Sequence, residues 1–182
     1  MSTSTRTPVL ERVQQRAGAL GAGTYAAVLA FAVLALAGAV GLGLKQPWLF
    51  PSLGPTVMLF FESPREDSSR PQNTLVGHVV GIAVGWAMLH LFALQHLPPA
   101  PVGGLTGGHV LAGALSVAIT SLILVATKHQ HPPAGASTLI VSLGILSSTT
   151  EVLTMVLAVV LVTAVGWALN LLLGQRPERA SA

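Results

Sequence analysis

The chain has 182 residues, of which 52% are apolar and only 8% are charged, whereas a soluble globular domain carries about 25% charged residues. A chain of this length still exposes roughly a third of its unfolded surface after folding, so it cannot hide this much apolar surface from water. The composition excludes a soluble enzyme, a disordered chain and a nucleic-acid-binding module, and it indicates a membrane protein. The absence of cysteine excludes disulfides, thiol catalysis and a zinc–thiolate site.

Four uncharged stretches are long enough to cross a bilayer, which takes about 20 apolar residues. The first is about twice as long as the apolar core of a signal peptide and no clear cleavage site follows it, so we interpret it as a retained helix. The expected fold class is therefore an all-α polytopic membrane protein. Its four spans are Thr24–Leu44, Val76–Leu94, Leu105–Thr127 and Leu153–Leu173.

Two further apolar stretches, Leu49–Phe61 and Pro132–Leu146, are too short for ordinary spans. Each begins near prolines, contains a glycine and continues as a helix of roughly 20 Å, against about 30 Å for the hydrocarbon core. Non-helical backbone at membrane depth is tolerated only where protein or water satisfies its polar groups. We therefore predict two short broken or half helices inside the bundle.

The second half of the chain resembles the first at a constant spacing of 81 residues. The pentapeptide AVGWA occurs at residues 83–87 and again at 164–168. The pattern predicts two repeats of long helix, short helix and long helix, over residues 24–94 and 105–173. The same spacing pairs Pro51 with Pro132 and Gly54 with Gly135.

Charge counting bears on whether the short helices cross the membrane or re-enter. If both re-enter, five of the nine basic residues lie on one side of the membrane and four on the other. If both cross, eight lie on one side and only Lys45 faces away. Since Lys and Arg accumulate on the cytoplasmic side, crossing is favoured, with both termini cytoplasmic and the repeats inverted. Residues 1–23 would be a cytoplasmic segment, 24–173 the membrane domain and 174–182 a tail.

The densest polar cluster of the apolar region lies between a long helix and a short one. A proline here fits the first turn of the helix, and the free N–H groups that follow would point into the interior. A helix N-terminus with such groups and a partial positive charge binds anions. The candidate ligands are Lys128, His129, His131, Pro132, Pro133, Ala134, Gly135, Ala136, Ser137 and Thr138.

A similar turn occurs at the equivalent point of the first repeat, with Ser52, Gly54 and Thr56 as candidates. Two such turns facing one another would replace the water around a small anion with amide and hydroxyl donors. Two alternatives stay open. The HPP turn is a purely structural turn, or His129 and His131 form a metal pair, for which no carboxylate or third histidine lies nearby in sequence.

Two further histidines lie near the starts of spans. His78 and His109 either cap a membrane interface or line the pathway, because ionisable groups inside a membrane are often functional. Glycines at four-residue spacing, at Gly77, Gly81 and Gly85, allow close helix packing, within the bundle or between subunits of a homo-oligomer.

Two ordered blocks of this sequence resemble a known family. Residues 131–136, HPPAGA, are similar to the signature of the HPP family of small integral membrane proteins. Residues 52–56 and 71–78 resemble the other block that the family shares, in order and in spacing. Gln72 stands where the family usually has a basic residue, and Pro55 replaces a small residue.

The resemblance covers residues 24–173 and implies a four-span membrane protein; for some members it implies nitrite transport. We therefore predict a transporter or channel for a small inorganic anion, with nitrite as the first choice. The alternative is a non-transporting scaffold or sensor subunit. An enzyme, a cofactor and a metal are not expected, because no carboxylate lies inside a long span. The expected location is a cell membrane, such as the bacterial inner membrane.

Overall fold

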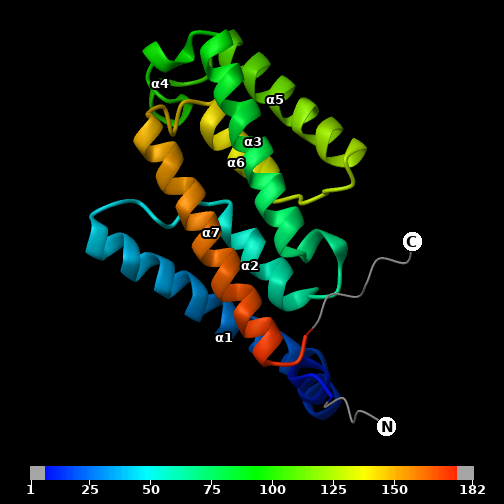
Figure 1. Cartoon of the computed structure of the whole chain (residues 1–182). Coiled ribbons are helices and arrows are strands. Elements are labelled where there is room, and N and C mark those ends of the chain that lie inside the picture. Colours follow the sequence, from blue (N-terminus) through cyan, green and yellow to red (C-terminus); the bar gives the residue numbers. More distant parts are fainter. Residues whose placement is uncertain (1–6, 176–182) are drawn as a thin grey trace.

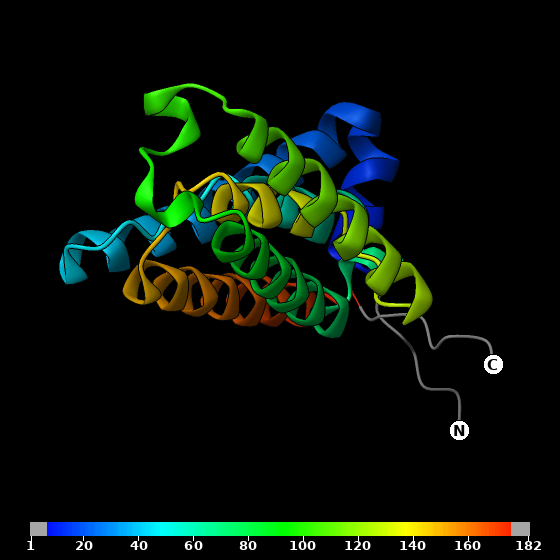
Figure 2. The same ribbon diagram turned by 90° about the horizontal axis from the view of Figure 1, so that it is seen from above.

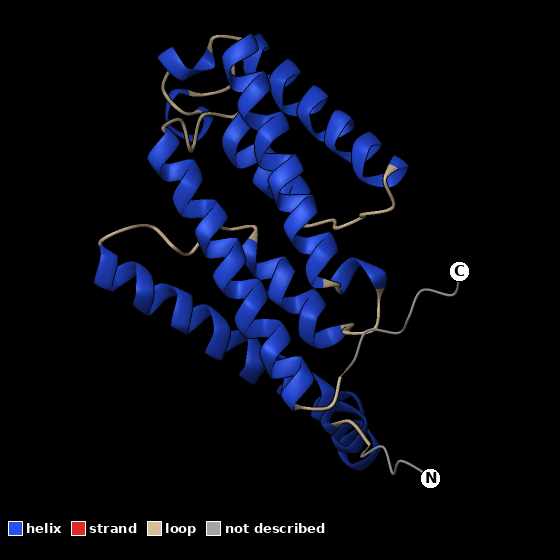
Figure 3. Cartoon of the chain, viewed as in Figure 1, coloured by secondary structure: helices blue, strands red, loops and turns tan. Residues whose placement is uncertain are grey.

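A computed structural model describes residues 7–175, and all regular structure in that range is helical (Figures 1 and 3). Four helices are long and apolar enough to cross a membrane, which confirms the all-α polytopic class. They are α1 (Val9–Leu44), α3 (Pro71–Leu91), α5 (Gly107–Ala126) and α7 (Thr149–Leu172). The shorter elements are α2 (Leu53–Glu62), η1 (Asp67–Ser69), η2 (Leu94–His96), α4 (Ala100–Gly103) and α6 (Ala134–Ser142).

Helix α1 begins earlier than the sequence predicts, at Val9 rather than Thr24. It is kinked where Ala17 and Gly18 leave the helical region, with Gly18 at a φ of 58° that a glycine adopts without strain. The part before the kink lies against the end of α7, because Val9 N–H donates to Leu173 O at 3.0 Å. The kink therefore separates the membrane span from a short helix that joins the two ends of the described chain.

The half helix α2 runs antiparallel to α3. Thr56, near the start of α2, contacts His78 in α3, whereas the carbonyl of Leu59 accepts a hydrogen bond from Ser69, just before α3 begins. Successive residues of α2 thus approach earlier residues of the segment that leads into α3. Helix α2 therefore extends from the level of His78 to the end of the bundle where α3 starts.

The half helix α6 runs parallel to α3 and lies between α3 and α5 (Figure 2). A Cβ atom at Gly77 would lie 3.4 Å from Ala134, and one at Gly85 would lie 3.1 Å from Val141. Helices α2 and α6 consequently start near one another and run in opposite directions. With 10 and 9 residues, they cover about 28 Å together, close to the ~30 Å hydrocarbon core.

The glycines of α3 form the contact with α6. A Cβ at Gly81 would lie 2.7 Å from the carbonyl oxygen of Ala134, and one at Gly85 would lie 2.6 Å from that of Thr138. No larger side chain fits between these backbones. The small-residue face predicted for α3 therefore packs inside the bundle.

Contacts at the two ends of the bundle show on which side each loop lies. Arg65, in the loop after α2, pairs with Glu11 at the start of α1, and Trp167 near the end of α7 donates to Ser69 O at 2.8 Å. The start of α1, the loop 63–70 and the end of α7 thus lie at one end of the bundle. At the other end, Ala100 N–H donates to Leu143 O at 3.1 Å. This arrangement is the one that two crossing half helices require, and it contradicts the re-entrant alternative.

Candidate functional site

Two histidines meet where the half helices begin. His78 of α3 and His131 of the HPP turn have Nε2 atoms 3.3 Å apart, and the two residues are 0% and 1% exposed. The hydroxyl of Thr56, from α2, lies 3.0 Å from His78 Nε2 and 3.3 Å from His131 Nε2. We call these three residues the histidine triangle.

The outer nitrogen of each ring is also bonded. His78 Nδ1 lies 2.7 Å from the hydroxyl of Ser137, in the first turn of α6. His131 Nδ1 lies 2.8 Å from the carbonyl oxygen of Ser68, and 3.5 Å from the hydroxyl of Thr74. The network thus links α2, α3, α6 and η1 through buried polar groups.

Hydrogen-bond chemistry fixes the protons of the neutral network. The Ser68 carbonyl only accepts, so His131 Nδ1 carries a proton and its Nε2 is bare. The Thr56 hydroxyl donates to Ser52 O at 2.9 Å, so towards the rings it can only accept. His78 Nε2–H must then be the donor inside the triangle, because the other tautomer would leave three lone pairs facing one another.

The backbone amides at the start of α6 differ from the prediction. The amides of Ala134, Gly135 and Ala136, predicted to be free, donate to the carbonyls of His131, Pro132 and Pro133 at 3.0, 3.0 and 3.1 Å. The prediction of free amides is wrong, because the HPP tripeptide turns tightly enough for its own carbonyls to accept these bonds. The donors towards the interior are therefore side chains.

Space is present beside both half-helix starts. A Cβ added at Gly54 or at Gly135 would meet no atom within 4 Å. Next to Gly135 lies a cavity of about 330 Å³, whose walls include Thr120, His131 and Pro132. The Ser52 hydroxyl is 0% exposed and has no hydrogen-bond partner among the described residues. This is an unsatisfied buried polar atom in the turn that leads into α2.

A model of the transmembrane region of the HPP family matches residues 15–179. The chain belongs to the HPP family. No curated protein and no solved structure matched it.

Three predicted site residues of this HPP protein lie away from the histidine triangle. His109 is buried at the start of α5, where it forms a capping box with Thr106. His129 bonds to Gln72 and to the carbonyl of Thr127, and Lys128 is exposed. Because His129 and His131 bond to different partners, the geometry gives no support to a metal pair between them.

The other predicted residues of the HPP protein lie in or beside the triangle. Thr138 bonds to Thr120 of α5 at 3.2 Å and to the carbonyl of Ala134 at 2.9 Å, and Pro133 is the residue that precedes α6. Sequence reasoning missed Thr74 and Thr120. Thr74 lies four residues before His78 on the same helix, so helical periodicity was the feature that could have revealed it.

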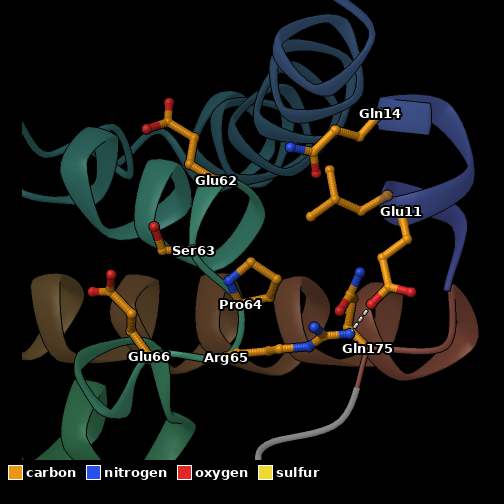
Figure 4. Close-up of a pocket in the computed structure, with 9 residues that line it drawn as sticks. Glu11, Gln14, Glu62, Ser63, Pro64, Arg65, Glu66 and Gln175 are labelled. Carbon is orange, nitrogen blue, oxygen red and sulfur yellow. Dashed lines mark hydrogen bonds and ion pairs between the residues drawn. The ribbon is translucent and has the colours of Figure 1, made fainter. Parts of the chain in front are cut away.

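A second cavity of the HPP protein, about 220 Å³ in volume, lies at the end of the bundle that holds the start of α1 and the loop after α2 (Figure 4). The pair of Glu11 and Arg65 crosses it. None of its lining residues belongs to the histidine triangle. This cavity is therefore separate from the buried site.

Proposed function

We propose that this HPP protein carries a small inorganic anion across the membrane, with nitrite as the first choice, past the histidine triangle. The observation that carries the proposal is a buried histidine pair between two half helices that start at the same place and run apart. Discontinuous helices that meet at the midplane are a common plan for the sites of secondary transporters.

The electrostatics favour an anion. Each helix N-terminus carries about half a positive charge, and two such ends are directed at one place. The free donor there is the Ser52 hydroxyl, beside His78 Nε2–H and, once that ring is protonated, His131 Nε2–H. The three α6 amides are bonded to the HPP turn, and the Ser137 hydroxyl is bonded to His78 Nδ1. A flat anion with few oxygens, such as nitrite, needs only a few donors.

The same proposal includes orientation and symmetry. The end of the bundle that holds Arg12, Arg16, Arg65 and Arg70 faces the cytoplasm, in agreement with the positive-inside rule.

The two halves are inverted repeats. Supporting this, α2 and α6 begin 81 residues apart, and α3 and α7 end 81 residues apart. The contact of Gly85 with Val141 corresponds at this spacing to that of Gly166 with Phe60.

In this proposal the protein catalyses no reaction, and further copies of the chain complete a homo-oligomer in the bilayer.

Nitrite influx into proteoliposomes that contain the purified protein tests transport. Flux well above that of protein-free vesicles, reduced at least tenfold in His131→Ala, supports the proposal. Wild-type vesicles that behave like empty ones would favour the scaffold or sensor alternative.

A further inference from the structure

We infer that the histidine triangle takes up a second proton when the anion binds, so that the protein moves the anion together with a proton. This inference rests on the proposed function. Its basis is the proton count of the triangle, whose three atoms, Thr56 Oγ1, His78 Nε2 and His131 Nε2, lie 3.0 to 3.3 Å apart.

The neutral triangle holds one proton, on His78 Nε2. Among the three atoms of the triangle, a second proton can be added only at His131 Nε2, because His78 Nε2 already carries one and Thr56 Oγ1 donates to Ser52 O. While His78 keeps its proton on Nε2, two N–H groups would then face each other across 3.3 Å, with Thr56 Oγ1 as their one acceptor. The second proton is therefore unfavourable while the site is empty.

An anion beside the rings changes this balance. It accepts a hydrogen bond from the new N–H group, and the positive ring supplies the counter-charge that a dehydrated anion needs in a buried place. The proton and the anion thus stabilise one another, and by linkage each raises the affinity for the other to the same degree. One H⁺ from water forms one N–H bond on His131, and the pair that moves is neutral for a monovalent anion.

Other ionisable groups on the surrounding elements do not take this role. Among the residues that the structure describes, none of them hydrogen-bonds to either ring of the triangle. They are Glu62 at the end of α2, Asp67 in η1, Lys128 and His129 before the HPP turn, and His109 and Glu151 in the first turns of α5 and α7. Arg70, which follows η1, pairs with Asp67.

A cavity lies next to His131. The cavity of about 330 Å³ is lined by this residue and by Gly135, where a Cβ would meet no other atom. Water in such a space would deliver the proton to His131 and the anion to the same side of the rings.

Calorimetric titration of the detergent-solubilised full chain with sodium nitrite tests the inference. In buffers of different ionisation enthalpy, we expect uptake of about one proton per nitrite bound. The affinity should fall about tenfold for each pH unit above the range in which the empty site titrates, because the bound state holds one more proton. Nitrite itself is fully ionised near neutral pH, so the proton comes to the protein.

Variants separate the possible results. His131→Gln should remove the proton uptake and flatten the pH dependence, and His78→Gln offers a second test if that variant does not fold. His96→Gln, which changes an exposed histidine outside the triangle, should behave like wild type. Nitrite binding by wild type without proton uptake would overturn the inference and leave the anion carrier intact. Absence of both nitrite binding and nitrite flux would overturn the proposed function itself.

Discussion

His78 and His131 lie with their Nε2 atoms 3.3 Å apart, although 53 residues separate them in the sequence. The neighbour of His78 makes this approach possible. A Cβ at Gly77 would lie 2.8 Å from the Cβ of His131, a separation that real side chains do not show. The absence of a side chain at Gly77 therefore sets the distance between α3 and the HPP turn.

Gly77→Ala should separate the histidines and abolish most nitrite flux, with an expected loss of at least tenfold, because the triangle no longer closes. Flux into proteoliposomes measures this. Gly43→Ala is the matched control, since a Cβ at Gly43 meets no atom within 4 Å. Equal flux in both variants would show that the geometry of the triangle is unimportant for transport.

Gly135 tests the space beside the HPP turn by a size series. Gly135→Ala should fold and transport like wild type, because the added Cβ meets no neighbour within 4 Å. Gly135→Leu should fold too, but should reduce flux at least tenfold because its side chain fills the cavity next to His131. Thermal stability and flux are measured in parallel. Unchanged flux in the leucine variant would place the pathway elsewhere.

Gly85 provides the opposite case on α3. Its Cβ would lie 2.6 Å from the carbonyl oxygen of Thr138, which is backbone and cannot move aside. Gly85→Ala should therefore destabilise the bundle by about 1–3 kcal/mol, the usual cost of overpacking. Thermal unfolding in detergent measures it, with Gly135→Ala as the control. A variant as stable as that control would contradict the tight α3–α6 contact.

Topology can be tested by cysteine labelling, since the natural chain contains no cysteine. Glu66→Cys, close to Ser68, and Val102→Cys both place the label at exposed positions, at opposite ends of the bundle. We expect an impermeant maleimide to label the first only from the cytoplasmic side and the second only from outside. Labelling of Glu66→Cys from outside would contradict the crossing arrangement and restore the re-entrant one.

Trp167 tests a hydrogen bond that joins α7 to the loop before α3. Its indole N–H donates to Ser69 O at 2.8 Å, so Trp167→Phe should destabilise the protein by about 0.5–1.5 kcal/mol. Trp86, which lies 81 residues earlier, makes no such indole bond in the part of the chain that the structure describes, and Trp86→Phe is the control. Detergent unfolding compares them, and equal losses would show that the bond contributes nothing.

Much of the site could be identified in the sequence because its residues stand in dense local patterns. Thr56, His131 and Ser137 occur in the two proline-containing turns, and each of them lies in the triangle or bonds to it. His78 and His109 were equivalent candidates in the sequence, both near the start of a span. Only the structure distinguishes them: α3 carries His78 to the HPP turn, whereas His109 caps its own helix.

The sequence by itself determined that the protein lies in a lipid membrane, that it has four long spans and that two short helices accompany them. These properties depend on composition and on the length of apolar runs. The tertiary structure alone decided that α2 and α6 start together and run apart, and that their starts enclose a histidine pair. It also decided that the α6 amides bond to the HPP carbonyls instead of facing the interior. Such contacts depend on the close approach of α3 to α6 at glycines, which local patterns permit but do not specify.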